Sequence, residues 1–212
     1  MNYLISLAIG YLLGSFPTAF IILKKYKQID ITKSGSQNVG ALNTYEVSES
    51  KLLGISVLLI DALKGFLTVY ILKLIFPDEF IFPAIALTAA VFAHCYSPWL
   101  KFKGGRGLAT AAGGSAYLAP PILILWILLW TIGFLFRKDV HVGNIMATIL
   151  SIAVVMTSSD ILIKYTLPPA TNELEFILPV SLMLFIIFIK HWKPLLEYIG
   201  KLKQKNKVFE NE

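Results

Sequence analysis

The sequence predicts an all-α polytopic membrane protein with seven transmembrane helices, the N-terminus outside and the C-terminus inside. The 212 residues have a mean hydropathy of +0.70, and 56% are hydrophobic but only 15% charged, which is too apolar for an ordinary soluble domain. Apolar segments recur at lengths suited to crossing about 30 Å of hydrocarbon. Sixteen of the 19 basic residues fall in loops on one predicted side, which marks that side as cytoplasmic.

The spans form one integral-membrane domain over residues 1–212. They are expected at about residues 3–23, 52–76, 82–99, 108–119, 122–136, 140–165 and 176–189. Pro17 should kink the first span, in which Gly10 and Gly14 let another helix approach closely. The fourth segment is too short to stand alone, so it must pack among other helices.

Composition also bounds the partners and the compartment. The net charge of +6 needs no nucleic acid to explain it, because basic loops are expected on the cytoplasmic face of a membrane protein. Cys95 is the single cysteine, so no internal disulfide is predicted. Nothing in the first residues resembles a cleaved signal peptide.

A polar stretch from Gln28 to Lys51 follows the first span and contains Ser34-Gly-Ser-Gln-Asn-Val-Gly-Ala-Leu-Asn43. It has neither helical nor strand periodicity, and its Ser, Gly and Asn residues favour turns. A long loop of this kind in a compact protein is either functional or a disordered linker. The apolar residues within it favour a functional loop, because a free linker has no need of them.

The second span carries Asp61 and Lys64, which share one helix face near the middle of the membrane. Isolated charges at that depth are costly, so the two side chains should pair and face the protein interior. This pair is interpreted as a structural ion pair, with direct catalysis as the alternative. His94, near the inner end of the third span, is interpreted as a packed or capping residue, again with catalysis as the alternative.

A glycine-rich basic run, Lys101-Phe-Lys-Gly-Gly-Arg-Gly-Leu-Ala-Thr110, joins the third and fourth spans. Its three glycines allow backbone N–H groups to turn toward one anion, and a helix beginning at Leu108 would point its amino end to the same place. Arg106 can grip two oxygens of a phosphate. The run therefore predicts a phosphate site at the cytoplasmic face, although basic residues at a membrane border also mark topology alone.

A phosphate site at a membrane surface, with an apolar lipid-facing groove behind it, suggests the joining of a soluble phosphate ester to an acyl chain. The sequence contains no usual catalytic triad, no Walker A pattern and no clustered carboxylates for a divalent metal. Chemistry would then depend on positioning, on stabilisation of an anion and on a histidine. No metal or other cofactor is expected.

Several stretches resemble the bacterial membrane family of acyl-phosphate:glycerol-3-phosphate acyltransferases, often called PlsY. Tyr11-Leu-Leu-Gly-Ser-Phe-Pro-Thr18 is similar to its first span, and Gly35-Ser-Gln-Asn-Val-Gly-Ala-Leu-Asn43 is similar to its Gly-Ser-Gly-Asn-Ile-Gly-Ala-Thr-Asn loop. Asp61-Ala-Leu-Lys-Gly65, the run from His94 to Thr110, and His191 also match. The similarity covers most of the chain in the same order.

The resemblance implies transfer of a fatty acyl group from acyl phosphate to the 1-hydroxyl of sn-glycerol 3-phosphate, giving lysophosphatidate and phosphate for phospholipid biosynthesis. It implies an enzyme of the bacterial cytoplasmic (inner) membrane whose active face is cytoplasmic, with a monomer favoured. The residues that it places in phosphate and substrate binding are Ser36, Asn38, Gly40, Lys103, Gly104, Gly105 and Arg106. Catalysis would involve His191, Ser36 and Asn43, with support from Asp61, Lys64 and His94.

The chain departs from the family pattern at several positions. Gln37 and Leu42 replace a glycine and a threonine of the loop, and Pro194 replaces an asparagine after the histidine. Glu46 stands where the family has a phosphate-contacting arginine, and the usual Gly-Thr-Glu ending near Gly200 is missing. Reversing a charge beside a bound anion costs on the order of several kcal/mol in a partly buried site. Either another cation compensates, or the acceptor differs, or activity is lost.

Two further hypotheses remain open. One keeps the membrane fold but changes the acceptor or donor, or leaves an inactive lipid-binding paralogue. The other is a small-solute transporter, which is less favoured because no inverted repeat is visible and the polar motifs lie at one face. Only the Asp61 and Lys64 pair favours transport.

Overall fold

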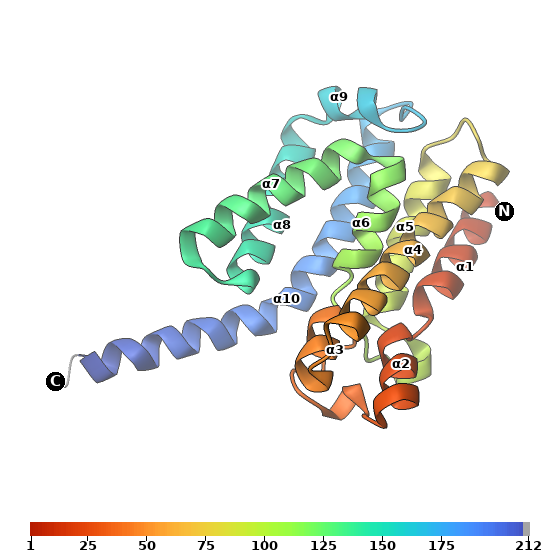
Figure 1. Ribbon diagram of the computed structural model, residues 1–212. Helices are drawn as coiled ribbons and strands as arrows, with labels where there is room; N and C mark the ends of the chain where they lie inside the picture. Colours follow the sequence, from red (N-terminus) through yellow and green to blue (C-terminus); the bar gives the residue numbers. More distant parts are fainter. Residues whose placement is uncertain (210–212) are drawn as a thin grey trace.

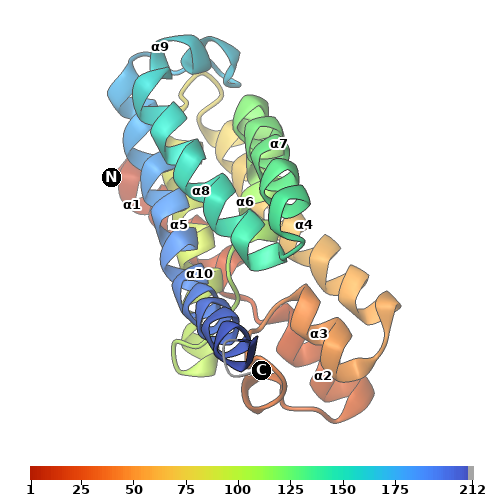
Figure 2. The same cartoon turned by 90° about the vertical axis from the view of Figure 1, so that its left-hand side faces the viewer.

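The chain is helical throughout the part that the structure describes. This computed structural model describes the backbone of residues 1–209 and the side chains of residues 1–200. The α-helices are α1 (Asn2–Ser15), α2 (Thr18–Lys27), α3 (Ala41–Ser48), α4 (Lys51–Ile75), α5 (Ile81–Cys95), α6 (Leu108–Leu118), α7 (Pro120–Arg137), α8 (Val140–Thr157), α9 (Ser159–Leu162) and α10 (Glu173–Phe209) (Figure 1). The helices α2 and α3 lie at the end of the bundle opposite to α9 (Figures 1 and 2).

Several of these helices have the length and composition of membrane spans. Among the described residues, the stretches long and apolar enough to cross a membrane are Asn2–Lys27, Lys51–Ile75, Pro120–Arg137, Val140–Thr157 and Glu173–Gly200. The helices α5 and α6 have 15 and 11 residues, fewer than the roughly 20 that a span requires. The all-helical class is confirmed, and the number of seven spans stays a prediction.

The first predicted span is not one kinked helix. It is divided into α1 and α2, with Phe16 and Pro17 between them in non-helical conformations. A proline inside a helix lacks the N–H that would continue the hydrogen-bond ladder and clashes with the preceding turn. The expectation of a kink at Pro17 was therefore too mild, because the helix breaks there and restarts at Thr18.

Other predicted boundaries also move. The third span ends at Cys95 instead of residue 99, and Pro98 begins a separate 3₁₀ turn. The fifth begins at Pro120, because proline is well suited to the first turn of a helix. The sixth ends at Thr157, before the short α9 and a 3₁₀ turn. The last begins at Glu173 and continues without interruption to Phe209, well beyond the predicted end at residue 189.

The polar stretch between the first two spans is more ordered than its sequence indicates. A 3₁₀ turn occupies Ile31–Lys33, and the eight-residue helix α3 occupies Ala41–Ser48. Local hydrogen bonds explain both, since the Asp30 carboxylate accepts from the Thr32 N–H at 3.0 Å and hydroxyl groups of α3 bond to carbonyls one turn back. The prediction of an irregular loop was wrong for these two segments.

Small residues bring the central helices together, as expected for a membrane bundle. A Cβ at Gly10 or Gly14 of α1 would overlap the backbone of Ala86 or Ala90 of α5. The close approach predicted for the first span is therefore confirmed. The helices α4 and α6 meet in the same way, because a Cβ at Gly65 would overlap the carbonyl of Thr110.

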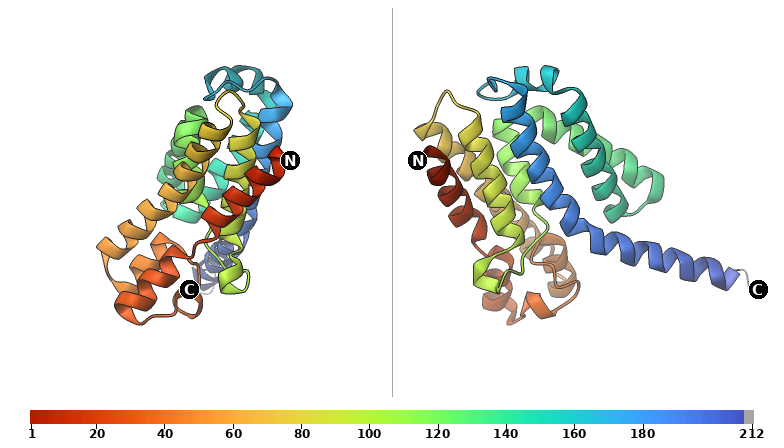
Figure 3. Two further views of the ribbon diagram at one scale, coloured as in Figure 1. Left: turned by 90° about the vertical axis from the view of Figure 1, so that its right-hand side faces the viewer. Right: turned by 180° about the vertical axis from the view of Figure 1, so that it is seen from behind.

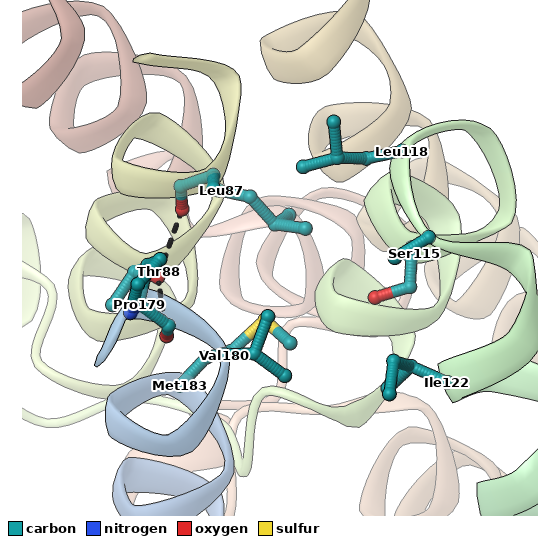
Figure 4. A pocket seen from close by; sticks show the side chains of 10 residues that line it. Leu87, Thr88, Ser115, Leu118, Ile122, Pro179, Val180 and Met183 are labelled. Carbon is teal, nitrogen blue, oxygen red and sulfur yellow. Dashed lines mark hydrogen bonds between the residues drawn. The ribbon is translucent and has the colours of Figure 1, made fainter. Parts of the chain in front are cut away.

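The helix α10 packs along α5 and α8 and closes the bundle (Figure 3). The Thr88 hydroxyl of α5 lies 2.9 Å from the Ala84 carbonyl and 3.0 Å from the Pro179 carbonyl of α10. A cavity of about 10 Å³ lies beside this contact, between α5, α6 and α10, and Leu87, Leu118 and other apolar side chains line most of it (Figure 4). Its size and lining are those of a packing defect, not of a substrate pocket.

A buried ion pair stabilises the break in the first span. Lys64 and Asp61 are both buried in α4, and the Lys64 Nζ lies 2.8 Å from the Asp61 Oδ1. The same ammonium donates to the Phe16 carbonyl at 2.8 Å, and the Ser97 hydroxyl donates to the Ser15 carbonyl at 2.7 Å. The Phe16 and Ser15 carbonyls, which the helix break leaves without helical partners, are thus bonded by Lys64 of α4 and by Ser97, which follows α5. A nonpolar environment requires such partners, because no water is available there. The structural interpretation of the Asp61 and Lys64 pair accounts for this geometry.

We expect that replacing Lys64 by methionine destabilises the folded protein by about 3 kcal/mol, because the Asp61 carboxylate is then buried without its partner. Thermal unfolding of the purified protein in detergent measures the effect. Lys51→Met, at the exposed start of the same helix, is the matched control and should unfold near the wild-type temperature. Equal melting temperatures for Lys64→Met and Lys51→Met would contradict a stabilising role for the pair.

Candidate functional site

The glycine-rich run docks against the carboxyl end of α5. Residues 97–103 form a tight turn in which the Ser97 N–H donates to the Lys103 carbonyl at 3.2 Å. The Gly105 N–H then donates to the His94 carbonyl at 3.0 Å. A Cβ at Gly104 would overlap the His94 and Cys95 carbonyls, and a Cβ at Gly105 would overlap the His94 ring. These two glycines are therefore required by close packing on α5.

The three glycines do not all turn their N–H groups toward one anion, as the sequence analysis expected. Of the three, Gly107 adopts a positive φ, 84°, and it immediately precedes the first turn of α6. The Gly105 N–H is committed to His94, so it is not open to an anion in this conformation. The helix does begin at Leu108, as the sequence indicates, so the amino end of α6 lies directly after the cations of the run.

The Ser/Gly/Asn loop is held in shape by Asn43. This side chain is buried, and its Oδ1 accepts from the Ser36 N–H at 3.0 Å. Its amide nitrogen donates to the carbonyls of Ser34 and Asn38 at 3.1 and 2.9 Å. Ser36 is exposed, and Gly40 is the N-cap residue of α3. The Asn43 amide is thus fully used inside the loop, while the Ser36 side chain faces outward.

The loop and the glycine-rich run meet, although about 60 residues separate them in the sequence. The Val39 N–H donates to the Gly104 carbonyl at 3.2 Å. Val39 is buried, so this contact lies inside the fold and not at its edge. The structure therefore brings together two of the motifs that the sequence singles out, and it leaves the exposed side chains of Ser36 and Lys103 at the surface beside them.

Arg106 reaches toward a histidine that the sequence analysis did not single out. Its Nη1 lies 3.5 Å from the Nδ1 of His141, in the first turn of α8. The Asp139 carboxylate caps this helix by accepting from the backbone N–H groups of His141 and Val142 at 2.8 and 3.0 Å. The available signal in the sequence was an Asp followed two residues later by His, after the basic pair at 137–138, which is typical of a capped helix start at the cytoplasmic face.

His191 of α10 completes this cluster. Its side chain is buried, and its Nδ1 lies 2.8 Å from the Ile187 carbonyl. Its Nε2 is also buried and has no hydrogen-bond partner among the side chains and backbone that the structure describes. It lies within range of the charge of Arg106. A neutral imidazole whose Nδ1–H donates to a carbonyl carries a lone pair on Nε2, so this nitrogen is an acceptor.

His141 has the opposite tautomer by the same reasoning. When its Nδ1 accepts from the Arg106 guanidinium, the proton of the neutral ring lies on Nε2, which is then a donor. The cluster therefore combines a cation on the glycine-rich run, a neutral donor on α8 and a buried acceptor on α10. These are the components needed to bind an oxyanion and to accept a proton near it.

Two carboxylates influence the guanidinium from outside. Burial lowers the pKa of Arg106 from its ordinary value, and the charges of Glu197 and Glu46 act in the opposite direction. Both glutamates are exposed, one on α10 and one on α3. Glu46 therefore lies on the rim of the cluster with its charge in water, where solvent screens much of the repulsion between it and a bound anion.

The predicted supporting residues lie beneath the glycine-rich run. The His94 Nδ1 is 4.0 Å from the Asp61 Oδ1, and the His94 carbonyl holds Gly105. Lys190, which precedes His191, donates to the Cys95 carbonyl at 2.9 Å and so ties α10 to the same end of α5. Among the described residues there is no group of three or more His, Cys, Asp or Glu side chains placed to hold a metal ion.

Comparison with known proteins gives consistent matches. A family model described as glycerol-3-phosphate acyltransferase matches residues 4–200. The glycerol-3-phosphate acyltransferase of Campylobacter lari is 30% identical over 211 residues, which cover 97% of this chain and 99% of the relative. The protein of the same description from Nitratiruptor sp. is 34% identical over 189 residues, covering 86% and 85% of the two chains.

Solved structures match as well. Two crystal structures of PlsY, an integral membrane glycerol 3-phosphate acyltransferase, superpose on the chain. Its glycerol 3-phosphate form has a TM-score of 0.73 and 27% identity and covers 97% of this chain and 94% of that chain. Its lysophosphatidic acid form has a TM-score of 0.75 and 26% identity, with 95% and 93% covered. Together with the long apolar helices, this likeness identifies a multi-pass membrane protein.

Proposed function

Because the chain belongs to the glycerol-3-phosphate acyltransferase family, we propose that the cluster of Arg106, His141 and His191 is where it transfers an acyl group to glycerol 3-phosphate. One observation carries the assignment of the site. A buried acceptor, His191 Nε2, has no hydrogen-bond partner among the residues whose side chains are described, and it lies within range of the charge of the Arg106 guanidinium. An unpartnered buried polar atom costs free energy unless a ligand satisfies it.

The donor in this proposal is an acyl phosphate. The 1-hydroxyl of glycerol 3-phosphate attacks the acyl carbon and gives its proton to His191 Nε2, while the bond between the acyl carbon and the phosphate oxygen breaks. The proton then passes to the departing phosphate. Phosphate is a good leaving group, so the reaction needs a base and charge stabilisation more than a strong acid.

The remaining predicted residues take positioning and binding roles. Arg106 binds phosphate oxygens in bidentate fashion, His141 donates from Nε2, and the exposed Lys103 attracts the anion from water. Ser36 and Asn38 lie on the loop beside them, where Ser36 meets the substrate. Asn43 acts through the shape of that loop, because its amide is used within it.

A second group of residues fixes the positions of the binding residues by packing. Gly40 is the N-cap of α3 within the Ser/Gly/Asn loop, and Gly104 and Gly105 hold the glycine-rich run against α5. Asp61, Lys64 and His94 support that end of α5 from α4 and from within. We assign to these six residues the geometry of the site and not contact with the reacting atoms.

We further propose that the seven apolar segments all cross the cytoplasmic (inner) membrane of a bacterium, with the site facing the cytoplasm. The basic loops support this orientation, since α2, the glycine-rich run and the tail of α10 lie at the same end of the bundle (Figure 1). The helices α5 and α6 are shorter than a full membrane span, so the non-helical residues at their ends must be shielded from lipid by neighbouring helices.

We expect that Arg106→Ala raises the KM for glycerol 3-phosphate by about tenfold or more, because a charge-assisted hydrogen bond to phosphate contributes about 1.5–3 kcal/mol. Arg106→Lys should give an intermediate value, since it keeps the charge and loses the bidentate grip. Lys101→Ala, exposed on the same run, is the control. Unchanged kinetics for Arg106→Ala, measured as lysophosphatidate formation, would exclude this phosphate role.

The two histidines should affect different kinetic constants. His191→Gln removes the base, so kcat should fall by about a hundredfold or more with little change in KM. His141→Ala removes a donor to the substrate and should mainly raise KM, whereas His141→Gln retains an N–H donor and should lose less. A His191→Gln enzyme with wild-type kcat would show that another group takes the proton.

Replacing Glu46 by the arginine that the family has at this position tests how the chain tolerates a negative charge near the phosphate site. Because Glu46 is exposed and its charge is screened, Glu46→Arg should leave kcat unchanged and lower the KM for glycerol 3-phosphate by about twofold to fivefold at low salt. The benefit should shrink as ionic strength rises. A large loss of activity would mean that Glu46 forms part of an arrangement peculiar to this protein.

A further inference from the structure

The carboxyl-terminal half of α10 carries an exposed apolar stripe that begins on the membrane-spanning part of the helix. Leu182, Phe185 and Ile189 line an apolar groove of about 1490 Å³ between α1, α5 and α10. The stripe continues as Trp192, Leu196 and Ile199, all exposed. Successive spacings of three and four residues keep these side chains on one side of the helix. The surface that faces lipid therefore does not end where the predicted span ends.

This part of α10 leaves the bundle at an angle. Figure 1 and the right-hand view of Figure 3 show the helix following the bundle and then running away from it sideways. Pro194 lies inside the helix, and a proline there removes a hydrogen bond and bends the axis. From Lys190 to Phe209 the helix is about 30 Å long at 1.5 Å per residue.

The same segment is strongly basic. Residues 190–209 contain six lysines and a single acidic residue, Glu197. Lys193 has a side chain that is 88% exposed and flanks the apolar stripe. Lys193 thus borders the stripe, and an apolar stripe with a cation at its border is the pattern of a helix that lies in the plane of a membrane interface, where lysine is attracted to anionic head groups.

We propose that the part of α10 beyond His191 is an interfacial helix that lies on the cytoplasmic leaflet, with Trp192, Leu196 and Ile199 in the membrane surface and Lys193 on anionic lipid head groups. A bilayer is favoured as the occupant of this face because the stripe is continuous with the lipid-facing groove and because the charge is complementary. A second copy of this chain or a soluble protein would have to bind the stripe at the membrane surface, in competition with the lipid that contacts the adjoining groove. This inference concerns the membrane surface and does not depend on the acyl-transfer assignment.

The proposal is tested by placing a fluorophore at single introduced cysteines in the full-length protein. Leu196→Cys and Ile199→Cys lie on the stripe, and Glu197→Cys, beside them on the polar flank, is the matched control. The wild-type protein, whose one cysteine is buried, gives the labelling blank. Each labelled protein is reconstituted into phosphatidylcholine vesicles with or without phosphatidylglycerol, and quenching by brominated lipid chains and by aqueous iodide is measured.

We expect brominated lipid to quench the label at residues 196 and 199 at least about threefold more than at residue 197, with the difference largest when phosphatidylglycerol is present. Lys193→Glu should weaken the effect of phosphatidylglycerol, and Lys193→Arg should retain it. Equal access of iodide to all three positions would overturn the proposal. Protection that is independent of lipid composition but rises with protein density would also overturn it, in favour of a second copy.

Discussion

The buried contact of Lys64 with the Asp61 carboxylate and the Phe16 carbonyl is the interaction on which the architecture depends. Pro17 breaks the first apolar segment inside a nonpolar environment, where free carbonyls cannot turn to water. Lys64 supplies a donor, and its charge is tolerated there because Asp61 neutralises it. The break lets α2 leave the line of α1 and gather with α3 at one end of the bundle (Figure 1).

A series of hydrogen bonds connects the helix break at Pro17 with the candidate site. Ser97 contacts the end of α1 and also closes the turn that begins the glycine-rich run. The run then docks on His94 through Gly105 and receives the Ser/Gly/Asn loop through Gly104. Arg106 follows directly, and its guanidinium reaches His141 of α8.

Sequence reasoning predicted what composition and local pattern encode. The all-helical membrane class, the charged pair of α4, the close approach at Gly10 and the helix start at Leu108 all follow from local rules. The break at Pro17 was underestimated, because its cost depends on whether distant donors such as Lys64 are present. His141 was missed, since its role depends on the 3.5 Å approach of Arg106, which no periodicity reveals. The length of α10 was missed because its apolar residues beyond position 189, Trp192, Leu196 and Ile199, are separated by polar and charged residues and are too sparse to extend a membrane span.

The cluster of Arg106, His141 and His191 is proposed to carry out one reaction, and the most direct test is the stoichiometry of its products. The purified wild-type protein in lipid is supplied with palmitoyl phosphate and glycerol 3-phosphate, and phosphate and lysophosphatidate are followed together. We expect both products to appear in equal amounts and neither to form when glycerol 3-phosphate is omitted. Folded, monodisperse protein that forms neither product would contradict this proposal and would show that the exchanges at Glu46 and Pro194 have moved the function elsewhere.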